Sequence, residues 1–226
     1  MTFLKKIAAA LAVLITVGAL AACSSTQPKY DAKEPLGPQI NYTITGIDAG
    51  AGVMTSTDKA LKAYGLVDKK WQLQPSSTAA MTSTLQKAIA DKRPIVVTGW
   101  TPHWMFTKFP LKFLKDPKHV YGRTEQIHTI VRKGLKQDAP QAYQVLDQFH
   151  WTPEEMSSVM LAVNGGKDPA EAAKAFVKKH PEQIAQWTKG VTHVSGKPKL
   201  TMTYIAWDSE IASTNVVATV LRQIGY

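Results

Sequence analysis

The chain has 226 residues, a formal net charge of +10, 44% hydrophobic residues and a single cysteine. This length allows one domain or two small lobes, and one cysteine excludes a disulfide within the chain. The lysines are scattered among acidic residues and form no continuous stripe, which argues against a nucleic-acid partner. The excess of basic residues is explained either by attraction to an anionic envelope surface or by a solvated basic face that has no partner.

The N-terminal segment is typical of a bacterial lipoprotein signal. A pair of lysines precedes the apolar stretch Ile7–Leu20, which is short for a membrane span and ends at small residues before Cys23. We predict a signal peptide over 1–22 and a lipid anchor on Cys23, at the outer face of the cytoplasmic membrane. An ordinary secretory signal with an incidental cysteine is the alternative. Residues 23–41 are predicted to be a flexible tether.

From Tyr42 onward, strand-like and helix-like segments alternate. We predict strands at Tyr42–Ile47, Trp71–Leu73, Pro94–Thr98, Ile127–Arg132 and Lys199–Ala206. We predict helices at Thr55–Tyr64, Thr78–Asp91, about 137–149, Pro153–Asn164, Pro169–Lys179, Pro181–Trp187 and Ile211–Ile224. This order of elements is typical of a three-layer α/β lobe.

Proline and glycine mark several helix ends. Pro153, Pro169 and Pro181 each stand at the first turn, behind a Thr, Asp or His that fits a helix start. Gly225 is predicted to close the last helix as a C-cap.

The predicted elements divide the chain into unequal parts. Residues 42–190 make a first ligand-binding lobe, 191–198 a hinge or linker, and 199–226 the start of a second lobe. Because one strand and one helix cannot bury a core of their own, the second lobe is expected to be incomplete.

A glycine-rich loop, Gly46–Thr55, separates the first predicted strand from the first helix. Its glycines let the backbone turn sharply and approach a ligand closely. The free N–H groups at the following helix start favour one small carboxylate. The glycine spacing does not match a nucleotide-binding loop. A tight turn with nothing bound is the alternative.

Two tryptophans occupy equivalent places, each directly after a predicted strand. Trp100 follows Thr98-Gly99, and Trp207 follows Ile205-Ala206. Indole faces attract cations that carry no hydrogen-bond donor, such as quaternary ammonium groups. Ordinary packing is the alternative. A core or helix-packing role is predicted for the other tryptophans, which are Trp71, Trp104, Trp151 and Trp187.

Catalytic and metal-binding patterns are weak. The six histidines lack metal-ligand spacing, so we predict neither a metal nor a cofactor. His103 is the exception of interest, since it stands close to Trp100. Asp208 precedes a helical run and is expected to cap it. No nucleophile elbow is present, so a tethered hydrolase using Asp48 or His103 is the weaker hypothesis, and no catalytic residue is assigned.

Four segments resemble glycine betaine-binding proteins of the OpuAC type, the lipoprotein receptors of osmoprotectant ABC importers. They are Gly46–Met54, Thr98–Phe106, Ile127–Gly134 and Ala206–Asn215. The resemblance covers about 42–226. It implies a type II periplasmic-binding-protein-like α/β fold, here one complete three-layer lobe plus the first strand and helix of a second.

The same resemblance implies a binding site for glycine betaine or proline betaine. Trp100 and Trp207 match two of the family's three cage tryptophans, and the backbone N–H groups of Gly52 and Val53 match its carboxylate site. The membrane subunit of an ABC importer is the implied partner, and no enzymatic activity is implied.

One family motif is missing from this sequence. The third tryptophan and a carboxylate-binding histidine belong to a Trp-Leu-Pro-Asn-Thr-His segment that does not occur here. We therefore expect this chain alone to bind betaine weakly or not at all. A non-binding remnant and one half of a split receptor are the alternatives.

Overall fold

The computed structural model describes residues 29–196 and 198–226. The predicted signal peptide over 1–22 and the predicted lipid anchor Cys23 lie outside this part of the chain. Among the helices of the described residues, none is both long enough and apolar enough to cross a membrane.

The described end of the predicted tether is structured. It contains the short helix α2 (Leu36–Gln39). The Gln39 side-chain amide donates to the carbonyls of Asp31 and Glu34, and the backbone N–H of Tyr30 donates to Lys92. From Tyr30 on, local and longer-range hydrogen bonds therefore replace the flexible segment that composition predicts.

The first half of the chain contains a small parallel sheet. Strand β1 (Thr43–Thr45) pairs with β2 (Gln72–Gln74), and Thr45 forms an isolated parallel bridge with Val97 on its other side. The connecting helices are α3 (Gly52–Ala63), η1 (Val67–Lys69) and α4 (Thr78–Ala90). Parallel strands joined through helices are the predicted βαβ arrangement.

The sheet is smaller than the sequence predicts. Pro94–Thr98 contributes the single bridge at Val97, and the predicted strands Ile127–Arg132 and Lys199–Ala206 are extended chain without strand pairing. Ile130 is 90% exposed. A β-branched pattern favours extended backbone, but a strand also needs a neighbour to accept its hydrogen bonds, and these two segments have none in the described part.

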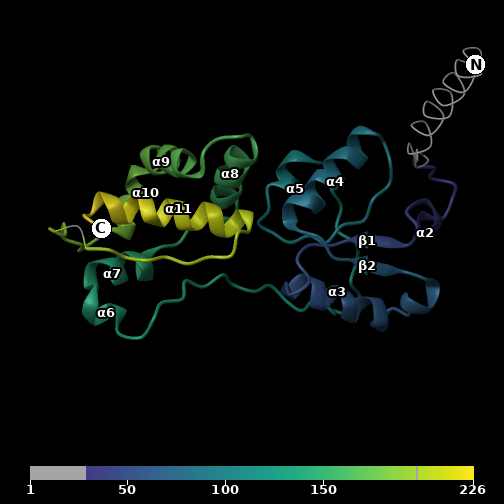
Figure 1. Ribbon diagram of the computed structural model, residues 1–226, viewed down its shortest axis with the longest axis horizontal. Coiled ribbons are helices and arrows are strands. Elements are labelled where there is room, and N and C mark those ends of the chain that lie inside the picture. Colours follow the sequence, from purple (N-terminus) through teal and green to yellow (C-terminus); the bar gives the residue numbers. More distant parts are fainter. Residues whose placement is uncertain (1–28, 197) are drawn as a thin grey trace, which may run out of the picture.

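Helices make up the second half. They follow the short helix α5 (Met105–Lys108) and are α6 (Leu135–Asp138), α7 (Pro140–Gln148), α8 (Pro153–Asn164), α9 (Pro169–Lys179), α10 (Pro181–Trp187) and α11 (Asp208–Gln223). Figure 1 shows two groups of elements side by side, with α2 to α5 and both strands in one and α6 to α11 in the other. The one helix predicted at about 137–149 is split, because Pro140 begins a new helix at its first position.

The predicted helix starts at three prolines are confirmed. At α8 the Thr152 side chain accepts from the N–H of Glu155, whose carboxylate accepts from the N–H of Thr152. At α9 the Asp168 side chain accepts from two backbone N–H groups. These side chains satisfy donors that a helix start leaves without partners.

The last helix is buried among the other helices. α11 packs mainly against α9 and α8, with Ala212, Val216 and Val220 fully buried. The division into a lobe over 42–190, a hinge over 191–198 and a second lobe from 199 stays a prediction. In the structure, the helix predicted for the second lobe shares a core with helices predicted for the first.

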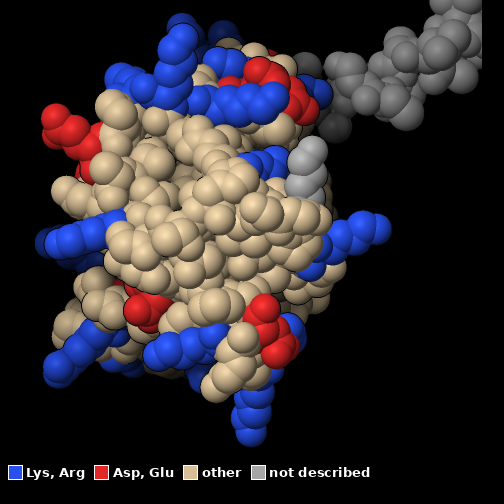
Figure 2. Space-filling model, turned by 90° about the vertical axis from the view of Figure 1, so that its left-hand side faces the viewer, with Lys and Arg blue, Asp and Glu red and all other residues tan. Residues whose placement is uncertain are grey.

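Charge is spread over the end of the helical group. Figure 2 shows lysines and arginines around the rim of this face, acidic residues among them and uncharged side chains across its centre. The basic excess therefore does not form a continuous stripe on this face.

Candidate ligand-binding site

Two loops leave the same edge of the small sheet. The N–H of Gly46, just after β1, donates to Gln74, and the N–H of Thr98 donates to Thr45. The glycine-rich loop after β1 and the loop that carries Trp100 therefore start from neighbouring, parallel segments. The carboxyl edge of a parallel sheet is where open α/β folds place their ligands.

Gly52 and Val53 are the first two residues of α3. The carbonyl of Ala51 accepts from Met54 and Thr55, while the first N–H groups of a helix have no acceptor within it. A Cβ built on Gly52 would meet no atom within 4 Å, so this helix start is open. The predicted anion site thus has backbone donors that the helix itself leaves without an acceptor.

Trp100 is half-buried at the rim of the core. Its ring meets the His103 imidazole edge-to-face, with centroids 4.7 Å apart and planes at 78°. Gly99 permits a close approach here, because a Cβ at that position would lie 2.8 Å from the Met105 methyl carbon. The Trp100 indole is therefore in contact with the loop that follows it.

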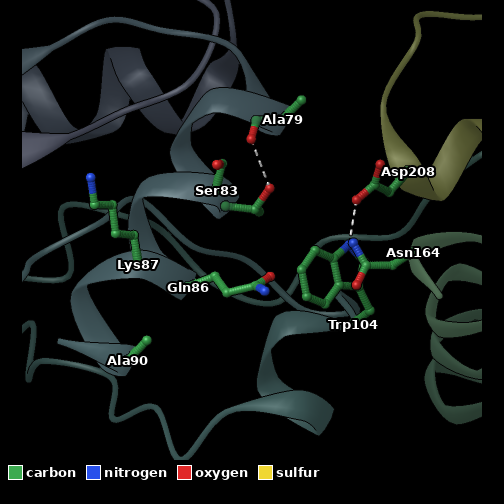
Figure 3. Close-up of a pocket in the computed structure, with 9 residues that line it drawn as sticks. Ala79, Ser83, Gln86, Lys87, Ala90, Trp104, Asn164 and Asp208 are labelled. Atoms are coloured by element: carbon green, nitrogen blue, oxygen red, sulfur yellow. Dashed lines mark hydrogen bonds between the residues drawn. The ribbon is translucent and has the colours of Figure 1, made fainter. Parts of the chain in front are cut away.

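Trp104 has a larger role than the core packing that the sequence predicts. It is 1% exposed, and its Nε1–H donates to Oδ2 of Asp208 at 2.5 Å (Figure 3). The ring lines a cavity of about 480 Å³ between the two groups of elements. The other residues that line it are Ala79, Thr82, Ser83, Gln86, Lys87, Ala90, Asn164 and Asp208.

His103 is buried beside the same carboxylate. Its Nδ1 accepts from the N–H of Met105 at 3.2 Å, which places the proton of a neutral ring on Nε2. Nε2 is buried without a hydrogen-bond partner and lies 3.6 Å from Oδ2 of Asp208. Burial lowers the pKa of His103, and the Asp208 carboxylate partly opposes that shift.

Trp207 occupies the N-cap position of α11 and is half-buried. Its Nε1 is buried without a hydrogen-bond partner. The prediction that Asp208 caps this helix is wrong, since Asp208 is its first residue and α11 has no side-chain cap. The carboxylate instead accepts from Trp104, a donor far away in the sequence.

The structure connects Trp100 with Trp207 through the residues between them. Trp100 contacts His103, His103 faces Asp208, and Asp208 directly follows Trp207. None of Trp100, Trp207, Gly52 and Val53 lines the 480 Å³ cavity. Their assignment as ligand-binding residues therefore stays a prediction.

Sequence reasoning missed Trp104 and Asp208 as parts of this arrangement. Each lies next to a residue that was singled out, Trp104 in the loop of Trp100 and Asp208 after Trp207. A pairing across 104 residues leaves no signal in local spacing. Across the described ranges, no group of three or more His, Cys, Asp or Glu side chains could hold a metal ion.

Comparison with known families decides the class of protein. Residues 24–179 match the OpuAC family model, the substrate-binding domain of the ABC-type glycine betaine transport system. The chain belongs to the OpuAC family. This confirms the resemblance carried by the glycine-rich and tryptophan-containing segments.

A curated relative covers nearly the whole chain. The chain is 66% identical over 223 residues to the glycine betaine/carnitine transport binding protein GbuC of Listeria monocytogenes, a match that spans 99% of this chain and 74% of that protein. This relative is, by its name, a transport binding protein.

Solved structures of the OpuAC type confirm the fold class. The chain is 48% identical to lactococcal OpuAC in its closed conformation with glycine betaine, with a TM-score of 0.64. This match spans 73% of the present chain and 64% of the OpuAC chain. It is 34% identical to ProX from Borrelia burgdorferi, a glycine/betaine/L-proline-binding protein, with a TM-score of 0.61. That match spans 74% of the present chain and 63% of the ProX chain. The chain thus spans about two thirds of these two structures.

Proposed function

We propose that this chain is an extracytoplasmic substrate-binding protein of an ABC importer that takes glycine betaine or a related quaternary ammonium zwitterion, such as proline betaine. The observation that carries the proposal is the pairing, at one sheet edge, of the Trp100 loop with the open helix start at Gly52 and Val53. The 66% identity to a glycine betaine/carnitine transport binding protein supports the same ligand class.

The ligand chemistry fits these groups. A trimethylammonium group offers no N–H donor, so ring faces such as those of Trp100 and Trp207 attract it through their quadrupoles, at ~0.5–2 kcal/mol per ring. The carboxylate of the same ligand would accept hydrogen bonds from the N–H groups of Gly52 and Val53, where the helix dipole adds to the attraction.

Binding without reaction is part of the proposal. His103, one of the two residues named for the hydrolase hypothesis, has its two nitrogens facing the Met105 N–H and the Asp208 carboxylate. A base that activates a nucleophile must be within hydrogen-bond reach of it. No hydroxyl or thiol within the described residues is hydrogen-bonded to His103.

The cellular setting completes the proposal. A lipid anchor on Cys23 would hold the protein at the outer face of the cytoplasmic membrane, where it would deliver its ligand to the importer's membrane subunit. The extracytoplasmic place follows from the predicted signal peptide and from the transport role of the relatives.

The test is calorimetric titration of the mature chain with glycine betaine up to millimolar concentration. Trp100→Ala and Trp207→Ala should each weaken binding by roughly 2- to 30-fold, since each removes one ring face. Tyr30→Ala, which removes an aromatic ring that is 56% exposed, should leave binding unchanged.

An analogue without the cationic head group tests the contribution of the positive charge. 3,3-Dimethylbutanoate keeps the shape and the carboxylate of glycine betaine but replaces nitrogen by carbon. We expect it to bind more weakly, and equal affinity would contradict a cation–π site. Complete absence of binding by the wild-type chain would reject the receptor role for this polypeptide alone and favour the split-receptor or remnant alternative.

A further inference from the structure

The Asp208 carboxylate bonds to a distant side chain and not to the helix on which it stands. As the first residue of α11, it could interact with that helix's own free N–H groups, where carboxylates are commonly found. Instead Oδ2 accepts from Nε1 of Trp104, which comes from the other group of elements (Figures 1 and 3). The carboxylate therefore joins the start of α11 to the loop of Trp100.

The bond matters because Trp104 is almost completely buried. An indole has one polar hydrogen, and a buried donor without a partner is costly. Asp208 supplies its acceptor, and hydrogen bonds to a charged group are stronger than neutral ones. The position of Trp104 is thus tied to that of Asp208.

A second donor faces the same oxygen. Nε2–H of His103 has no hydrogen-bond partner, is buried and lies 3.6 Å from Oδ2 of Asp208. The other side of this imidazole packs edge-to-face against Trp100. A shift of the carboxylate would therefore be felt by the His103 ring and, through it, by the Trp100 indole.

We propose that Asp208 is a positioning residue of the binding site, which fixes the Trp100 loop against the helix start that carries Trp207. The inference rests on the proposed function, since it assigns these two indoles to one ligand. Asp208 acts through Trp104 and His103 and does not itself touch the ligand. The carboxylate sets the relative placement of two ring faces that lie on different groups of elements.

The first measurement needs no ligand. The protein has six tryptophans, and labelling them with ¹⁵N gives indole N–H signals that single Trp→Phe variants assign. In Asp208→Ala, the signal of Trp104 should move from its hydrogen-bonded position, and that of Trp100 should move with it. Glu210→Gln removes a charge from the same helical turn and should move neither, because within the described residues the Glu210 carboxylate accepts from Ser209 and not from a tryptophan.

The second measurement is affinity for glycine betaine. Asp208→Ala should weaken binding by roughly 3- to 30-fold, whereas Asp208→Asn, which keeps an oxygen acceptor for Trp104, should recover part of the loss. A purely structural role would lower stability in both variants without this rescue of affinity. If Asp208→Ala does not fold, Trp104→Phe removes the same bond from its other side and should shift the Trp100 signal.

The outcomes separate the two proposals. If the wild-type chain does not bind glycine betaine, the proposed function fails, and the ligand-free indole signals still decide whether Asp208 positions Trp100. If the wild-type chain binds, an unmoved Trp100 signal in Asp208→Ala and in Trp104→Phe would overturn the positioning role. Equal loss of affinity in Glu210→Gln would overturn it as well.

Discussion

At the residue scale, the most distinctive feature of this molecule is a group of three polar side chains that contact one another. His103 and Trp104 are buried, and the partly exposed Asp208 carboxylate faces a ring nitrogen of each. Burying such ring nitrogens costs free energy unless their partners are in place, so the position of the carboxylate matters for both rings.

His103 makes stability depend on pH. Burial lowers its pKa in the folded state below the ordinary value of 6.5, with Asp208 opposing the shift. The unfolded chain therefore binds a proton at a higher pH than the folded one, and the free energy of unfolding falls as the pH drops below about 6.5. Denaturant titrations between pH 7.5 and 5 should show this loss.

A matched pair of variants isolates the effect. His103→Gln should flatten this part of the stability profile, because it removes the titrating group. His128→Gln, at an exposed position, should keep the wild-type slope. The same slope in His103→Gln and in the wild type would show that another group is responsible.

At the element scale, helices followed the sequence closely and strands did not. Pro153–Asn164, Pro169–Lys179 and Pro181–Trp187 have the predicted bounds, because caps and prolines act within one turn of the residues that they organise. The segments 127–132 and 199–206 have strand-like sequences but pair with no other segment of residues 29–196 and 198–226.

The predicted C-cap of the last helix is confirmed in detail. Gly225 has a positive φ of 109°, its N–H donates to Arg222, and the N–H of Tyr226 donates to Leu221. These two bonds form a Schellman motif. The N–H of Val194 also donates to Ile224, which fixes the preceding loop to this helix end.

Gly225→Ala should therefore lower the free energy of unfolding, although the residue lies next to the C-terminus. A left-handed conformation costs a non-glycine residue about 1–2 kcal/mol, and the new Cβ would collide with the carbonyl of Val194. Thermal unfolding should report a loss of at least ~1 kcal/mol. Gly166→Ala, also at positive φ but with no atom near its Cβ, is the control for strain alone and should cost less.

On the scale of the whole molecule, two groups of elements are joined by a long exposed segment (Figure 1). Its beginning is held on α3, where the Tyr64 hydroxyl donates to Asp116 and the Tyr121 hydroxyl donates to Thr57. From 121 to 134 every residue is exposed. The link between the groups thus has few buried contacts of its own.

Limited proteolysis should find this segment first. Trypsin is expected to cut after Arg123 or Lys133, because local opening there breaks few contacts. Mass spectrometry of the first fragments identifies the site. Early cleavage within α8 or α9 instead would mean that the helical group opens before the connecting segment does.

The sequence alone determined the local features and the family. Cap residues, proline positions and the four motif segments act over a few residues, so the helices, the OpuAC membership and the candidate residues Trp100 and Trp207 could all be read from it. Only the tertiary structure decided which extended segments pair, that α11 packs on α8 and α9, and that Asp208 binds Trp104. These depend on groups far apart in the chain, whose meeting is set by burial and by the availability of a partner rather than by neighbouring residues.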